Sequence, residues 1–163
     1  MKNFKLNEKD ILSNQDWTFP TTTYYGPGRF NEIGKFCEEF DIKNPLIVTD
    51  SGSKDLPFIK KLIALLSKNN IKSDLFYNIS PNPRDDEISK GCDQFKNGSH
   101  DSIIAIGGGS AMDGGKSICL TVNSETPLWD FEFEQPVPKI TKENAFPKII
   151  TCLLYTSDAA DDK

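Results

Sequence analysis

The strongest constraint on the fold is an alternation that begins near Asp41, where short apolar runs are followed by longer segments of helical period. The run "PLIVTD" at 45–50 predicts a buried strand, and residues 54–70 repeat apolar side chains as an amphipathic helix does. The same pair recurs with strands at 72–80 and 101–106 and helices at 84–98 and 110–122. This order is typical of βαβ units, so we expect an α/β fold, a Rossmann-like parallel sheet with flanking helices.

The segments on either side complete one domain at residues 21–151. Residues 21–40 predict a β segment, a Gly-Pro-Gly turn and a helix, and residues 1–20 are expected to be a poorly ordered lead-in or an edge arm. Residues 123–147 contain four prolines and predict a long surface loop with one short helical turn, and 147–151 predicts a further strand.

Composition excludes several classes of function. The net charge is −5, with 19 basic residues interspersed among 24 acidic ones, which argues against a general nucleic-acid binder. No apolar run approaches the roughly 20 residues of a membrane span, and the first residues lack the apolar core of a signal peptide, so the expected compartment is the cytoplasm. The four cysteines form no C-x-x-C pair and are expected to be reduced, partly buried thiols.

A glycine turn between the strand at 101–106 and the following helix is the main candidate site. Such a turn exposes backbone N–H groups at the positive end of a helix dipole, where anions bind. The sequence does not match the phosphate-binding loop of nucleoside triphosphatases, G-x-x-x-x-G-K-[ST]. If Gly115, Lys116 and Ser117 are its end, Ser110 stands where its first glycine belongs. The G-x-G-x-x-G fingerprint fits Gly107 and Gly109 but places Met112 at the third glycine.

The pattern present is G-G-G-S-x-x-D-x-x-K, formed by Gly107, Gly108, Gly109, Ser110, Asp113 and Lys116. The glycines allow a pyrophosphate to come close to the backbone, and Ser110 is placed to N-cap the helix with Asp113 completing a capping-box-like arrangement. Lys116 can neutralise Asp113 or reach a phosphate. Gly114 and Gly115 indicate a close approach of the helix to the sheet or to a ligand. A turn that only packs the helix onto its strand is the alternative.

This pattern resembles the iron-containing alcohol dehydrogenases and their glycerol dehydrogenase and dehydroquinate synthase relatives, over roughly residues 20–151. "YYGPGRF" is similar to the family's F-G-x-G segment, and "PNPRDD" is similar to its P-N-P-T loop, with Arg84 in place of threonine. The resemblance implies that NAD is the cofactor, with Asp50 facing the adenosine ribose and Asn82 near the adenine and ribose. An acid at position 50 favours NAD over NADP, because it would repel a 2′-phosphate. A plain turn role stays open for both residues.

The resemblance also implies a function for the complete enzyme. In this family a C-terminal helical domain supplies one Asp and three His ligands to a divalent iron, and an alcohol is oxidised, or an aldehyde or ketone reduced, by hydride transfer. This chain has one histidine, His100, which we expect at the surface or in a turn, so the sequence offers no catalytic and no metal-binding residue. The alternatives are the nucleotide-binding half of a glycerol dehydrogenase or dehydroquinate synthase-like enzyme, and a non-catalytic dinucleotide-binding module. A homo-oligomer is left open, with no nucleic-acid or membrane partner.

The last twelve residues, "CLLYTSDAADDK", resemble the translation of a sequencing adapter more than a protein element. We therefore expect residues 152–163 to be foreign to the domain. On this view the chain is an N-terminal fragment, inactive alone, with at most weak dinucleotide binding. A natural but divergent terminus is the alternative.

Overall fold

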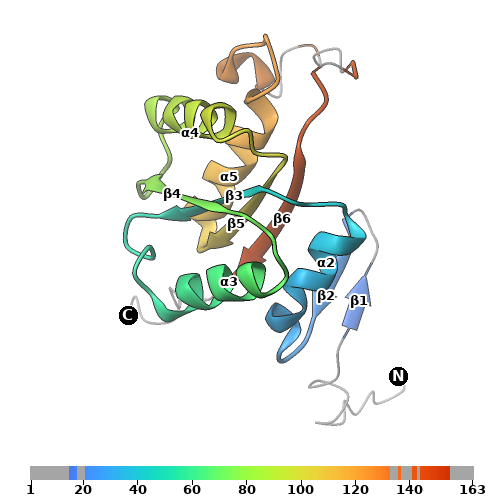
Figure 1. The fold of residues 1–163 in the computed structure, drawn as a ribbon. Coiled ribbons are helices and arrows are strands. Elements are labelled where there is room, and N and C mark those ends of the chain that lie inside the picture. Colours follow the sequence, from blue (N-terminus) through green and yellow to red (C-terminus); the bar gives the residue numbers. More distant parts are fainter. Residues whose placement is uncertain (1–14, 18–20, 133–135, 137–140, 143, 155–163) are drawn as a thin grey trace, which may run out of the picture.

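The computed structural model describes residues 15–17, 21–132, 136, 141–142 and 144–154. Its centre is a four-stranded parallel sheet in the order β4-β3-β5-β6 (Figure 1). The strands are β3 (Pro45–Asp50), β4 (Asp74–Ile79), β5 (Ser102–Gly107) and β6 (Lys148–Leu153). The predicted α/β fold with a parallel sheet is confirmed.

Helices cover both faces of the sheet (Figure 1). On one face lie α2 (Ile33–Glu39) and α3 (Pro57–Lys68), and on the other lie α4 (Asp85–Asn97) and α5 (Gly109–Thr121). The helix predicted from residue 54 begins at Pro57 because proline suits the first helical position, where an N–H has no partner. Among the residues that the structure describes, no helix is long and apolar enough to cross a membrane.

The core follows the period of two that a strand imposes on its side chains. Leu46 and Val48 of β3 pack with α4 and α5, whereas Ile47 between them packs with α2 and α3. All three are fully buried. Because both faces of the sheet are covered, the strand is apolar without alternation, as parallel strands are.

Two adjacent glycines set how closely α5 approaches the sheet. A Cβ added at Gly115 would lie 2.4 Å from the Cβ of Ala105, and one added at Gly114 would lie 2.7 Å from Cδ1 of Ile79. Real Cβ atoms do not come this close, so larger residues here would push α5 off the sheet. The close approach expected from this glycine pair is confirmed on the side of the sheet.

Smaller elements frame the sheet at both ends of the chain. Within the expected lead-in, β1 (Gln15–Trp17) pairs antiparallel with β2 (Thr23–Tyr25), as an edge arm would, while residues 1–14 and 18–20 lie outside the described residues. The 3-10 turn η1 (Arg29–Glu32) precedes α2, and η2 (Leu128–Phe131) is the short helical turn expected in the 123–147 loop.

The edge strand β6 continues past the boundary expected at Thr151. Cys152 is in register with Ile106, Leu153 with Gly107, and the Leu154 N–H donates to the Gly107 carbonyl at 2.9 Å. The first residues of the segment predicted to be foreign thus pair in the sheet. The origin of residues 152–163 stays a prediction, and 155–163 lie outside the described residues.

The only histidine in the sequence follows the turn between α4 and β5, as expected, but it is buried, so the expectation of a surface position is wrong. The side chain of His100 is fully buried at the amino ends of the strands, with Nδ1 3.0 Å from the Asn44 carbonyl oxygen. Its Nε2 lies 3.4 Å from Oδ2 of Asp74, without the geometry of a hydrogen bond. The ring fills the space beside Gly98, where a Cβ would come within 2.3 Å of Nε2.

Candidate functional site

The topology of the sheet points to one place for a ligand. The connection after β3 leads to α3 on one face, and the connection after the neighbouring β5 leads to α5 on the other (Figure 1). Open α/β sheets bind ligands outside the carboxyl ends of two such strands, where the connections diverge. Here β3 ends at Asp50 and β5 ends at Gly107.

Gly107 has a backbone conformation that other residues rarely adopt. Its φ is +142°, and an added Cβ would lie 2.9 Å from the Cβ of Ala111 and 3.1 Å from Oδ2 of Asp50. Both the backbone and the crowding therefore require glycine. This turn brings the carboxylate of Asp50 next to the start of α5.

The first turn of α5 is open. The helix begins at Gly109, with Gly108 as the N-cap residue, and within the described residues no side chain caps it. A Cβ added at Gly109 would meet no atom within 4 Å. Helix-start N–H groups have no partner inside the helix, so free donors and free space coincide here, which is the arrangement that binds anions.

The expected N-cap role of Ser110 is wrong. Gly108 takes the extended conformation of the N-cap, so Ser110 becomes the second residue of the helix and its side chain makes no capping bond. Asp113 consequently does not complete a capping box. It lies instead with its Oδ1 3.8 Å from Nζ of Lys116, as the spacing of three predicted, and both side chains are more than half exposed.

Asp50 has a structural role on one oxygen. Its Oδ1 accepts hydrogen bonds from the backbone N–H groups of Gly52 at 3.0 Å and Ser53 at 2.9 Å, which closes the turn after β3. Its Oδ2 faces Gly107. The turn role left open by the sequence is thus present, and a ribose contact by the same carboxylate stays a prediction.

Thr49, which the sequence did not mark as a site residue, links the two strands whose ends form the site. Its fully buried hydroxyl donates to the Ile106 carbonyl at 2.8 Å and joins β3 to β5 one residue before both strands end. The signal was a hydroxyl within an otherwise apolar strand. A buried hydroxyl needs a partner, and here the partner fixes the spacing of the two strand ends.

Asn82 follows β4, whereas the other predicted site residues lie at or after the ends of β3 and β5. It is exposed in the turn after β4, with φ +58°, and β4 borders β3 on the side away from β5. The turn is held by Glu87, a second residue that the sequence analysis missed. Its signal was the spacing of three between Arg84 and Glu87 at a helix start.

The donor set of the described residues does not fit an iron site. Within this part of the chain no three His, Cys, Asp or Glu side chains gather closely enough to hold a metal ion. His100 directs Nδ1 at the Asn44 carbonyl oxygen and is enclosed at the opposite edge of the sheet from Gly107.

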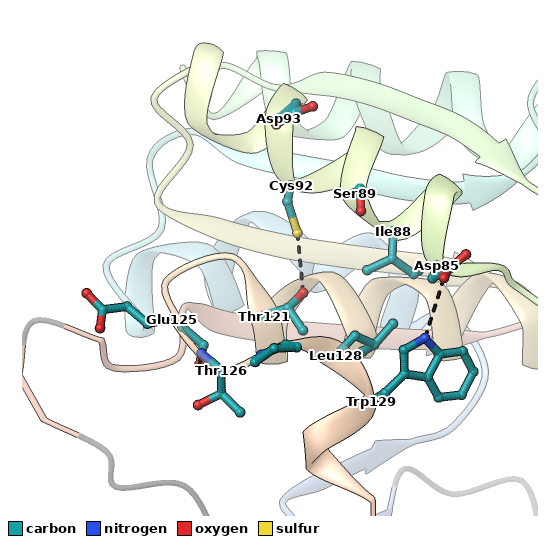
Figure 2. A pocket seen from close by; sticks show the side chains of 12 residues that line it. Asp85, Ile88, Ser89, Cys92, Asp93, Thr121, Glu125, Thr126, Leu128 and Trp129 are labelled. Carbon is teal, nitrogen blue, oxygen red and sulfur yellow. Dashed lines mark hydrogen bonds between the residues drawn. The ribbon is translucent and has the colours of Figure 1, made fainter.

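Two surface hollows lie away from the glycine turn. One of about 460 Å³ separates α4 from the segment after α5, where the indole N–H of Trp129 donates to Asp85 at 3.4 Å (Figure 2). Another of about 730 Å³ lies near Asn44 and Asp74. Neither is lined by a predicted site residue, so the candidate site rests on topology and backbone geometry and not on enclosed volume.

Comparison with known proteins shows which family the chain resembles. The model of a family described as iron-containing alcohol dehydrogenase matches residues 20–160, and the match ends inside the segment expected to be foreign. A 1,3-propanediol dehydrogenase of Klebsiella pneumoniae is 28% identical over 135 residues, covering 79% of this chain and 35% of the relative. The NADH-dependent butanol dehydrogenase A of Clostridium acetobutylicum is 32% identical over 137 residues, covering 83% and 34%.

Solved structures show the same fold. A 1,3-propanediol oxidoreductase aligns with a TM-score of 0.70 at 27% identity, over 78% of this chain and 32% of its own. An alcohol dehydrogenase from Oenococcus oeni aligns with a TM-score of 0.69 at 26% identity, over 79% and 33%. The chain spans about a third of the length of the curated relatives it matches.

Proposed function

Because the chain belongs to the iron-containing alcohol dehydrogenase family, we propose that it binds NAD where β3 and β5 end, as the dinucleotide-binding part of an alcohol dehydrogenase. NAD, when bound, accepts a hydride from an alcohol or returns one to an aldehyde or ketone. The observation that carries the proposal is the uncapped, unobstructed first turn of α5 beside the carboxylate of Asp50.

The glycine turn fits a pyrophosphate. The backbone N–H groups at Gly109 and Ser110 would donate to its oxygens at the positive end of the helix, and the missing side chain at Gly109 leaves room for them. Lys116 would add a positive charge on the same helix, although Asp113 at 3.8 Å partly offsets that charge.

Asp50 and Asn82 would recognise the adenosine end. A carboxylate at the end of β3 accepts hydrogen bonds from ribose hydroxyls and repels a 2′-phosphate, which supports NAD over NADP. Asn82 at the end of the adjacent β4 would border the adenine and ribose. The substrate would be an alcohol or its carbonyl product, a class supported by the propanediol and butanol dehydrogenases among the relatives. The described residues do not fit iron, because no three His, Cys, Asp or Glu side chains gather among them.

Substituting Gly109 tests the site without disturbing the fold. Gly109→Ala adds a methyl group where nothing lies within 4 Å, so the melting temperature should stay unchanged while the methyl group obstructs the pyrophosphate. Titration with NADH, followed by its fluorescence, should show binding to the original chain and a weakening of at least about tenfold, or about 1.4 kcal/mol, in the variant.

A matched control adds a methyl group elsewhere. Ser89→Thr does so on the exposed side of α4 and should change neither stability nor NADH affinity. If the original chain does not bind NADH, or if Gly109→Ala binds as tightly as the original chain, the proposed site is wrong.

A further inference from the structure

We propose that Glu87 is the positioning residue for the adenosine end of this site, because its carboxylate holds the turn that carries Asn82. The inference rests on the proposed function, since Asn82 is given a role only there. Glu87 itself would touch no ligand. It lies in the first turn of α4, and its side chain is 7% exposed.

One carboxylate closes the turn at both ends. Oε2 of Glu87 accepts from the backbone N–H of Ser80 at 3.2 Å, from the Ser80 hydroxyl at 3.0 Å and from the backbone N–H of Arg84 at 3.2 Å. Oε1 accepts from Nη2 of Arg84 at 3.1 Å. The donors belong to the residue after β4 and to the residue before α4, so the carboxylate fixes the distance between strand and helix.

Asn82 lies in the middle of the turn between Ser80 and Arg84 that Glu87 closes. It lies between Pro81 and Pro83, with φ +58°, a left-handed conformation that asparagine tolerates better than most residues. Each proline has a fixed φ and restricts the residue before it, and Glu87 holds both ends of the segment. These restraints together leave Asn82 few alternative conformations.

The charge of Glu87 is satisfied where it lies. Burial opposes its ionisation, but the hydrogen bonds from Ser80 and Arg84 outweigh burial, and the pKa of the carboxyl is lowered from its usual value. The guanidinium of Arg84 is also 3.4 Å from Oδ1 of Asp86. Arg84, which stands where the family has threonine, thus forms ion pairs with Asp86 and Glu87 of α4.

A double-mutant cycle on NADH affinity tests the inference. If Glu87 acts through Asn82, Glu87→Ala and Asn82→Ala should each weaken NADH binding by about tenfold, and the double variant should bind no more weakly than Asn82→Ala alone. Glu87→Gln keeps one acceptor oxygen and should recover part of the loss. Asp93→Ala removes an exposed carboxylate from the same helix and should have no effect.

Amide hydrogen exchange without nucleotide supplies a second readout. Glu87→Gln should accelerate exchange at Ser80 and Arg84 while the strands β3 and β5 keep their protection, and this variant serves if Glu87→Ala does not fold. Unchanged exchange at both amides would overturn the inference.

The two proposals fail in different ways. Losses that add in the double variant, or an intact affinity in Glu87→Ala where Asn82→Ala binds weakly, would overturn the role of Glu87 alone. If the original chain does not bind NADH although the amides respond as expected, the proposed function is wrong and the cofactor role of Glu87 falls with it.

Discussion

The sheet has a carboxyl edge, where its strands end, and an amino edge, where they begin. Both edges have a turn closed by an aspartate, and they differ in which backbone groups of the neighbouring helices lack a partner. At the carboxyl edge Asp50 accepts from the N–H groups of Gly52 and Ser53, and at the amino edge Asp101 accepts from those of Lys43 and Asn44. Each aspartate fixes a turn. Hydrogen-bonded carboxylates are thus needed for the fold at both edges and do not by themselves mark a ligand site.

The difference lies in the ends of the helices that meet these edges. The end of α4, at the amino edge, is capped by Asn44, whose amide donates to the carbonyl oxygens of Gly98 at 3.0 Å and Ser99 at 3.1 Å. The start of α5, at the carboxyl edge, has no side-chain cap within the described residues. A 730 Å³ hollow lies at the amino edge, but the end of α4 presents carbonyl oxygens there, at the negative end of a helix dipole. The start of α5 presents N–H groups at the positive end, so it is the helix end suited to an anion.

The largest expected effect comes from breaking the carboxyl edge at Gly107. Gly107→Ala forces a φ of +142° on a residue with a Cβ and places that Cβ 2.9 Å from Ala111. The free energy of unfolding should fall by about 2–3 kcal/mol, and NADH binding should be lost with the turn geometry. Chemical denaturation measures the first effect and fluorescence titration the second. Stability equal to that of the original chain would contradict the conformation described for this turn.

Breaking the amino edge should separate stability from binding. Asn44→Ala removes the cap of α4 and leaves the Gly98 and Ser99 carbonyl groups without this partner, at a cost of about 1–2 kcal/mol. Because Asn44 lies at the opposite edge from the glycine turn, the affinity for NADH should not change below the melting transition. The same two measurements apply, and a parallel loss of NADH affinity would show that the edges are not independent.

Removing only the charge of Asp50 sharpens the comparison between its two oxygens. Asp50→Asn retains an acceptor for the N–H groups of Gly52 and Ser53, so the turn and the melting temperature should be preserved. Without the negative charge, NADPH should gain affinity relative to NADH by about tenfold. Parallel titrations with the two nucleotides give the ratio. An unchanged ratio would leave Asp50 with its turn role alone.

The pH dependence of stability should report Glu87. Its pKa is lowered in the folded state, because hydrogen bonds from Ser80 and Arg84 outweigh the effect of burial. A lowered folded-state pKa gives stability that is present above the usual value of about 4.5 and is lost as the pH falls through the folded-state pKa. The original chain should therefore melt higher than Glu87→Gln near pH 7, with the gap closing below pH 4.5. A gap that is constant with pH would contradict the charged network.

The sequence predicted the layers better than the contacts within the site. Continuous apolar runs placed β3 and β5 correctly, because parallel strands buried on both faces must be apolar. The local pattern failed for Ser110, since the helix start depends on the backbone angles of Gly108. It also failed for the burial of His100, whose ring contacts Asn44, far away in the chain. Contacts of this kind come from tertiary packing, which a local pattern does not encode.

Two cysteines at opposite edges can report which edge a substitution has opened. Burial raises the pKa of the Cys119 thiol to about 11 and also raises that of Cys152, so both should be alkylated slowly at neutral pH. Cys119 contacts the Pro147 carbonyl before β6 begins, whereas Cys152 is in register with Ile106 at the opposite end of that strand.

Iodoacetamide labelling, located by peptide mass spectrometry, should distinguish the two edges in Gly107→Ala. The Gly107 carbonyl accepts from the Leu154 N–H, so distorting the glycine turn should loosen this end of β6 and accelerate labelling of Cys152 by a few-fold. Cys119 should keep its original rate, because the contacts around it are unchanged. The original chain treated in parallel is the control. Equal acceleration at both cysteines would mean that the substitution opens the whole sheet, and the edges would then not be separate units of stability.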